Sequence, residues 1–176
     1  ERLGRRGGVV LAKSSTPEFG SLPVTWNPIH GHTRSPWDTR LSAGGSSGGA
    51  AAALAAGEVW LAQGSDIGGS LRIPAAFCGV VGFRPSPGLV PSDKRAFGWT
   101  PISVQGPMGR TVADTCLLLA AQASSDSCDP LAGPVDPLSF REPMPVDLAR
   151  PNSWMQPTML REANGAETPL PRYAQH

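Results

Sequence analysis

The stretch GGSSGGAAAALAAGEVWLAQGSDIGGSLRIPAAFCGVVGFRP (residues 44–85) determines the fold prediction for this chain. It contains a glycine-rich loop, a helix of small residues that ends at Gly57, a strand, a second glycine-rich turn and another helix. A further strand in residues 80–91 and a helix in residues 106–123 continue the alternation. Alternating strands and helices predict an α/β fold, in which helices cover a mixed, at least partly parallel sheet.

The elements outside this stretch are predicted from shorter patterns. Thr111 and Asp114 have the spacing of a capping box, and the helix after them is expected to bury one apolar face, made of Val112, Cys116, Leu119 and Ala123. The apolar run Val9–Ala12 predicts a short buried strand. Past about residue 140 no periodicity is sustained, so we predict one core domain over residues 1–140 and a Pro-rich, disordered tail over residues 141–176.

The composition excludes several classes of partner and site. The 176 residues carry a net charge of +1, which gives no electrostatic reason to expect nucleic acid or an anionic membrane as a partner. The three cysteines show no CxxC spacing, so neither a disulfide framework nor a zinc site is expected, and a reducing compartment such as the cytoplasm is favoured. No apolar run approaches the ~20 residues of a membrane span.

The loop GGSSGG (44–49) could be interpreted as a phosphate cradle, because it leads into a helix N-terminus. A P-loop, however, needs a lysine directly after its last glycine, and here Gly49 is followed by alanines. A dinucleotide-binding loop needs GxGxxG directly after a strand, which this loop does not follow. A phosphate-binding module therefore stays only as an alternative, supported by the helix N-terminus alone.

The second turn, GSDIGGSLR (64–72), presents a candidate nucleophile. Ser70 lies where several backbone N–H groups can point at one spot, as an oxyanion hole requires; these are the N–H groups of Ile67, Gly68, Gly69 and Ser70. Ser70 also needs a base, and His30 and His32 have no evident carboxylate to orient them. A relay of serines that ends at a lysine is the other known solution, and the doubled serines of the first loop would supply its middle member. Asp66 and Arg72 are expected to form a buried ion pair that shapes this turn.

Both motifs together resemble the amidase signature family, whose pattern is GGSSGG, a small-residue helix and then G-[ST]-D-x-GGS-[LI]-R-x-P-A-x-x-C-G. Ser46 and Ser70 have the spacing of that family's two catalytic serines. The flanking segments VVLAKSSTPEFG, HGHTRSPWDTRLSA and GPMGRTVAD resemble the family's as well, with Ser35 and Gly109 as departures from its usual Asn and Ala. The resemblance covers about residues 1–140.

This resemblance implies an incomplete amidase signature fold and a role for each serine. Ser70 would be the nucleophile that becomes acylated, with an oxyanion hole formed by the backbone of residues 67–70. Ser46, preceded by a cis peptide bond, would pass the proton of Ser70 to a neutral lysine, with Ser47 as an accessory hydrogen-bonding residue. The family implies a small-molecule amide as substrate, no metal or organic cofactor, and a homodimer as a possible assembly.

The lysine of this triad is the missing member. In the family it lies in a VKDN-like segment upstream of the one that Lys13 matches, so we expect an N- and C-terminally truncated fragment without the triad lysine, weakly active or inactive alone. Lys13 could replace it only if buried, since a lysine base must be desolvated or lie near positive charge to become neutral, and Lys94 matches no catalytic position. Three interpretations remain: an amide hydrolase, a non-catalytic fragment of an amidase or of the amidase subunit of a tRNA-dependent amidotransferase, and a phosphate-binding module.

Overall fold

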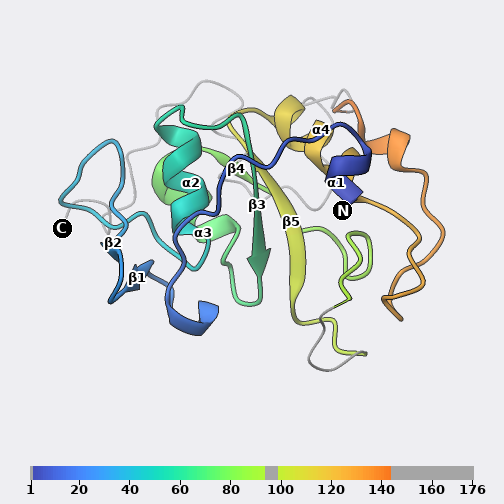
Figure 1. Ribbon diagram of the computed structural model, residues 1–176, viewed down its shortest axis with the longest axis horizontal. Coiled ribbons are helices and arrows are strands. Elements are labelled where there is room, and N and C mark those ends of the chain that lie inside the picture. The colour runs from blue at the N-terminus through green and yellow to red at the C-terminus, as the bar shows by residue number, and fades with distance from the viewer. Residues whose placement is uncertain (1, 94–98, 144–176) are drawn as a thin grey trace, which may run out of the picture. The chain divides into compact units, whose positions relative to one another are not determined.

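The computed structural model describes residues 2–93 and 99–143. Its helical elements are α1 (Arg2–Arg5), α2 (Gly48–Ala55), α3 (Arg72–Cys78), α4 (Val112–Gln122) and the 3₁₀ turns η1 (Glu18–Gly20) and η2 (Pro137–Phe140). Its strands are β1 (Trp26–Asn27), β2 (Gly31–His32), β3 (Leu61–Asp66), β4 (Val81–Gly82) and β5 (Val104–Gly109) (Figure 1). Lys94 and nearly all of the predicted tail lie outside the described residues.

The larger sheet has the order β3-β5-β4, and both of its pairs are antiparallel. In the β3–β5 pair, Leu61 lies opposite Gly109 and Asp66 opposite Val104. In the β4–β5 pair, Val81 lies opposite Gly109. The α/β class is therefore confirmed, but the expected parallel neighbours are absent from the described strands. The reason is that β3 and β4, which run in the same direction and are joined through α3, are separated by β5.

Strand β5 was not predicted, because Gly106, Pro107 and Gly109 weaken any strand pattern in residues 104–109. The helix predicted over residues 106–123 was therefore wrong at its start, since residues 106–109 belong to β5 and α4 begins at Val112. Its composition instead fits its crowded central position. A Cβ on Gly106 would collide with the carbonyl oxygen of Phe83, and one on Gly109 would lie 2.8 Å from the Cβ of Asp114 in α4. Residues without side-chain bulk therefore allow the neighbouring segments to pack closely on this strand.

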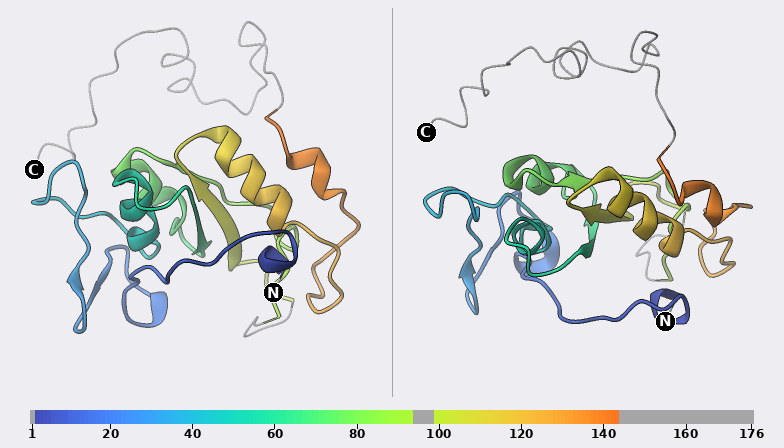
Figure 2. Two further views of the ribbon diagram at one scale, coloured as in Figure 1. Left: turned by 45° about the horizontal axis from the view of Figure 1, so that its top comes forward. Right: turned by 90° about the horizontal axis from the view of Figure 1, so that it is seen from above.

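Helices α2 and α3 pack together, with α2 against β3 and α3 against β4, whereas α4 packs mainly against the central strand β5 and has α1 beside it (Figures 1 and 2). The core between α2, α3 and the sheet is built from small side chains around a few larger ones, namely Ala43, Ala50, Ala51, Leu54, Leu71, Ala75, Cys78 and Met108. The predicted end of α2 is confirmed, because Gly57 adopts the left-handed conformation after it, with φ of 77°. Gly79 does the same after α3, with φ of 67°.

One prediction about burial was wrong, and a second was confirmed only in part. Residues 9–12 form no strand, and Val9, Val10 and Leu11 are 82%, 78% and 69% exposed, because no described strand pairs with them. In α4 the capping box of Thr111 and Asp114 is confirmed, but the buried stripe comprises Thr115, Leu118, Leu119, Ala120 and Gln122. Thr115, Leu118, Leu119 and Gln122 follow the spacing i, i+3, i+4, i+7. Of the predicted face, Leu119 and Ala123 are buried, whereas Val112 is 55% exposed.

Candidate active site

The two glycine-rich loops meet through Ser47. Its backbone N–H donates a 3.3 Å hydrogen bond to the carbonyl oxygen of Ser70. Its side-chain oxygen accepts a 3.3 Å bond from the N–H of Ser65 and lies 3.4 Å from the carbonyl oxygen of the same residue. Ser47 begins α2 without capping it by its side chain, because the hydroxyl is used to hold the loop to the end of β3.

The two serines expected to react differ in exposure. Ser46 is 4% exposed, whereas Ser70, at the turn between β3 and α3, is only partly buried. The peptide bond between Gly45 and Ser46 is cis, as the family resemblance implies. Within the described part of the chain, neither the Ser46 nor the Ser70 hydroxyl makes a hydrogen bond. The buried Ser46 thus lies on a loop that is hydrogen-bonded, through Ser47, to the backbone of the more accessible Ser70.

The glycines of GGSSGG let other segments pass close to this loop. A Cβ on Gly45 would lie 2.8 Å from the carbonyl carbon of Val24. A Cβ on Gly48 would collide with the side chain of Thr25, and one on Gly49 with the backbone of Ser15. Segments 22–25 and 15–16 therefore pack directly against the loop backbone, and a side chain at these positions would push them away.

Thr25 is a residue of the site that the sequence interpretation missed. It is 1% exposed, and its side-chain oxygen lies 2.9 Å from the carbonyl oxygen of Gly44 and 3.2 Å from that of Ser46. The same oxygen accepts a 3.0 Å bond from the N–H of Gly48. A threonine in an irregular segment gives no local signal of this role, because its partners lie about 20 positions further along the chain.

The N-terminus of α2 is already occupied by protein groups. The N–H of Gly48 donates to Thr25, and the N–H of Gly49 donates a 3.2 Å bond to the carbonyl oxygen of Ser15. A phosphate cradle uses these first free N–H groups of a helix to hold the anion. The structure therefore disfavours the phosphate-binding alternative, which depended on this helix end.

Asp66 organises the turn that bears Ser70. Its side chain is fully buried and accepts bonds from the N–H groups of Gly69 (2.8 Å) and Leu71 (3.2 Å). The expected ion pair with Arg72 is present, with Nε 3.0 Å from Oδ2, but only Asp66 is buried, since the Arg72 side chain is exposed. Burial works to raise the pKa of Asp66, but the bonds from Arg72, Gly69 and Leu71 outweigh it and hold the pKa at about 2. Asp66 therefore stays ionised at neutral pH and ties the turn together.

Arg84, which the sequence interpretation also missed, binds the same carboxylate group of Asp66. Its Nη1 lies 2.9 Å from Oδ1 of Asp66 and also donates to the backbone carbonyl of that residue. Its Nη2 donates a 2.9 Å bond to the carbonyl oxygen of Ile102. One guanidinium thus connects the end of β3 to the segment that leads into β5.

The four N–H groups expected to form an oxyanion hole are not equivalent. The N–H of Gly69 donates to Asp66, whereas those of Ile67, Gly68 and Ser70 have no recorded partner in the described part of the chain. These three groups are therefore the ones free to bind a ligand. Gly69 has a φ of 121°, which a residue with a side chain rarely adopts, so the turn depends on a glycine at this position.

The structure offers no basis for Lys13 as the missing base. Lys13 lies in the extended segment after α1 and is exposed. The alternative in which Lys13 replaces the triad lysine therefore loses the partial burial that it depended on.

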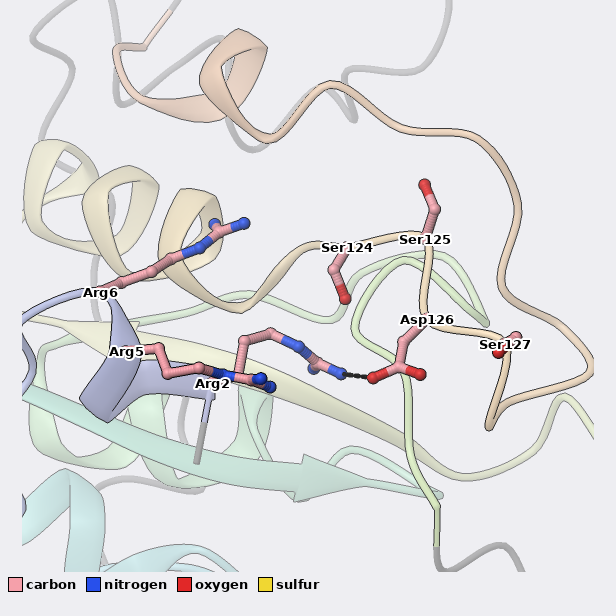
Figure 3. A pocket seen from close by; sticks show the side chains of 7 residues that line it. All are labelled: Arg2, Arg5, Arg6, Ser124, Ser125, Asp126 and Ser127. Carbon is pink, nitrogen blue, oxygen red and sulfur yellow. Dashed lines mark hydrogen bonds and ion pairs between the residues drawn. The ribbon is translucent and has the colours of Figure 1, made fainter.

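A separate hollow lies between α1 and the C-terminal end of α4, lined by Arg2, Arg5, Arg6 and residues 124–127 (Figure 3). Arg2 pairs with Asp126 at 2.8 Å and lies 3.4 Å from the carbonyl oxygen of Gln122, and Arg6 donates to that of Ala120. Cations commonly bind the free carbonyls at a helix C-terminus in this way. None of the predicted site residues lines this hollow, and two of its three arginines already bind the end of α4.

Comparison with known proteins agrees with this geometry. The chain belongs to the amidase family, the amidase signature enzymes: the family model described as Amidase matches residues 1–151. Acylamidase from Rhodococcus erythropolis is 48% identical over 135 residues, which are 75% of this chain and 28% of the relative. Indoleacetamide hydrolase from Bradyrhizobium japonicum is 41% identical over 160 residues (84% and 34%). A glutamyl-tRNA(Gln) amidotransferase subunit from Geobacillus stearothermophilus is 41% identical over 160 residues (88% and 33%).

Solved structures show the same relationship. A bacterial aryl acylamidase of the amidase signature family superposes with a TM-score of 0.72 at 39% identity, over 76% of this chain and 28% of that one. The 6-aminohexanoate cyclic dimer hydrolase, complexed with substrate, superposes with a TM-score of 0.71 at 36% identity, over 76% and 28%. The chain thus spans about a third or less of the length of the relatives it matches.

Proposed function

We propose that the protein carrying this chain hydrolyses the carbon–nitrogen bond of carboxylic amides through an acyl-enzyme on Ser70. The observation that supports this most is the hydrogen bond from the N–H of Ser47 to the carbonyl oxygen of Ser70, because it joins the loop of the buried Ser46 to the turn of the accessible Ser70. Membership of the amidase family and the similar amide hydrolases add support.

In this mechanism the Ser70 hydroxyl oxygen attacks the amide carbonyl carbon and passes its proton to Ser46, which passes its own to a base. The developing oxyanion accepts hydrogen bonds from the N–H groups of Ile67, Gly68 and Ser70. Each such donor typically contributes about 10²–10³ in rate. The carbon–nitrogen bond then breaks, and the amine leaves with a proton returned through Ser46. Water hydrolyses the ester by the same route and frees Ser70.

The remaining parts of the proposal rest on the family resemblance, on the hydrogen bonds of the two turns and on the cysteine content. The base is a lysine other than Lys13, and neither a metal nor an organic cofactor takes part. Ser47, Asp66 and Arg72 support the two turns without touching the substrate. The substrate is a small-molecule amide, the protein acts in the cytoplasm, and a homodimer is its proposed assembly. For location, the structure contributes only that none of the described helices has the length and apolarity to cross a membrane.

The test is covalent labelling with a fluorophosphonate probe together with hydrolysis of an aryl amide, in the complete protein and in residues 1–176 alone. We expect Ser70→Ala to abolish labelling and turnover, and Ser46→Ala to lower both strongly. Labelling of Ser70→Ala at the wild-type rate would overturn the proposal.

A second candidate is the amidase subunit of a tRNA-dependent amidotransferase, favoured by the 41% identity to the glutamyl-tRNA(Gln) amidotransferase subunit. In this candidate the same serines would act, and glutamine is the amide to be tested. Hydrolysis of aryl amides without hydrolysis of glutamine would favour the first candidate. Hydrolysis of glutamine without hydrolysis of aryl amides would favour the second.

A further inference from the structure

The Thr25 hydroxyl binds the loop on both sides of Ser46. It contacts the carbonyl oxygen of Gly44 two residues before this serine, the N–H of Gly48 two residues after it, and the carbonyl oxygen of Ser46 itself, at 2.9, 3.0 and 3.2 Å. The backbone of Thr25 adds a bond, since its N–H donates to the same Gly44 carbonyl at 3.0 Å.

The Ser46 side chain has no comparable support of its own. Within the described residues its hydroxyl makes no hydrogen bond, so the backbone of residues 44–48 determines where the hydroxyl lies. Two sets of contacts hold this backbone in place. Ser47 bonds Ser65 and Ser70, and Thr25 bonds the loop itself. Loss of the Thr25 contacts would therefore let Ser46 move relative to Ser70.

The close packing of Thr25 leaves little freedom for such a shift in the native protein. Thr25 is 1% exposed, and the absence of a Cβ at Gly48 is what allows its side chain to approach the loop. Thr25 is itself held by the N–H of Thr33, which donates a 2.9 Å bond to its carbonyl oxygen. The hydroxyl is thus presented to the loop from a fixed position.

We propose that Thr25 is the positioning residue for Ser46: its hydroxyl sets the loop geometry that aims the Ser46 side chain at Ser70. This inference rests on the proposed serine relay and assigns no chemical step to Thr25. A purely structural role, in which the hydroxyl only satisfies the first N–H of α2, would affect folding without any special dependence on Ser46. The two roles can therefore be separated by experiment.

The experiment is a double-mutant cycle in the complete protein. Thr25→Val keeps the shape of the side chain and removes the hydroxyl, and Thr25→Ser keeps the hydroxyl and removes the methyl group. Each is combined with Ser46→Ala, and the rate of fluorophosphonate labelling of Ser70 is measured together with kcat, KM and the thermal unfolding midpoint. The labelling rate remains measurable where turnover is too slow.

We expect Thr25→Val to lower kcat and the labelling rate by about 10- to 100-fold with KM nearly unchanged, because small displacements of reacting groups are costly. Thr25→Ser should retain most of the rate. In the Ser46→Ala background, Thr25→Val should lower the labelling rate by no more than about twofold, because a residue that acts through Ser46 has nothing left to position.

An equal loss from Thr25→Val with and without Ser46 would overturn the inference, as would an unchanged rate in folded Thr25→Val. If Thr25→Val does not fold, Thr25→Ala, whose smaller side chain leaves room for a water molecule, goes through the same cycle with the same criteria. The proposed function itself fails separately, through normal labelling of Ser70→Ala.

Discussion

The N–H of Ser47 lies 3.3 Å from the carbonyl oxygen of Ser70, so the two glycine-rich turns are joined by a backbone hydrogen bond. The Ser47 hydroxyl strengthens this junction by accepting a bond from Ser65. The Ser47 hydroxyl also fills the space next to Gly64, since a Cβ on Gly64 would lie 2.5 Å from the Ser47 side-chain oxygen. The junction therefore depends on a serine in one motif and a glycine in the other.

Gly64→Ala should consequently separate the two turns. We expect the added methyl group to lower the free energy of unfolding by about 1–3 kcal/mol, the usual cost of overpacking, and to slow fluorophosphonate labelling of Ser70. Chemical denaturation and labelling measure the two effects. Gly133→Ala is the matched control, because a Cβ there meets no atom within 4 Å. Equal stability of the two variants would contradict the described packing.

Arg84 and Arg72 bind the same carboxylate but should differ in importance. The Arg84 side chain is 25% exposed and also bonds the carbonyl oxygens of Asp66 and Ile102, whereas that of Arg72 is 56% exposed and bonds Asp66 alone. We expect Arg84→Met to lower the free energy of unfolding by about 1–3 kcal/mol, as for hydrogen bonds to charged groups. Arg72→Met should cost less, because water screens an exposed pair.

Both arginine variants are measured by chemical denaturation and by the rate of Ser70 labelling. Arg84→Met should be slower in labelling than Arg72→Met, since the turn loses its connection to the segment before β5. A larger effect of Arg72→Met in both measurements would show that the exposed arginine dominates and would contradict this ranking.

Asp66 should make stability depend on pH in the acid range. Its pKa is about 2 in the folded protein, below the unfolded value near 3.8, so the folded state binds the proton less readily than the unfolded one. Its contribution is fully present above about pH 4 and is lost as the pH falls toward 2, on the order of 2 kcal/mol in total. Asp66→Asn should remove this part of the dependence. Parallel curves for the two proteins between pH 5 and 2, measured by chemical denaturation, would contradict it.

Local patterns predicted the elements that are determined locally. The run of small residues with Gly57 after it gave α2, and the spacing of Thr111 and Asp114 gave the start of α4. The strand at Val9–Ala12 was predicted from the same kind of pattern, yet a strand needs a partner, which no described segment provides. Sequence pattern alone shows the preference of a segment and not whether its partner is present.

The candidate site shows the same division between local and distant information. Ser46 and Ser70 were found because they lie in two motifs with recognisable spacing. Thr25 and Arg84 were missed because their roles consist of bonds to residues 18–23 positions away. A threonine or an arginine in an irregular segment does not indicate which residue it will bind. Only the folded structure therefore identifies the partners of Thr25 and Arg84.

The cysteines should react in an order set by burial. Cys78 is fully buried in the α2–α3 core, and burial raises the pKa of its thiol to about 11, whereas Cys128 is exposed. Since the thiolate is the reactive form, we expect an aromatic disulfide reagent at pH 8 to modify Cys128 in the folded protein and Cys78 only after denaturation. Cys128→Ser identifies the fast thiol, and Cys78 modified as fast as Cys128 would contradict the core packing.

Lys13 should be dispensable for catalysis. It is exposed in the extended segment after α1, and the proposed base is a different lysine. We expect Lys13→Met to change kcat and the labelling rate by less than about twofold, against the strong losses in Ser46→Ala and Ser70→Ala. The measurement is the pH profile of labelling from pH 6 to 10 in the complete protein. The labelling rate should show the same dependence on pH in Lys13→Met as in the wild type. If the inflection at basic pH disappeared in Lys13→Met, Lys13 would be the base, because an inflection is lost only when the group that titrates is removed.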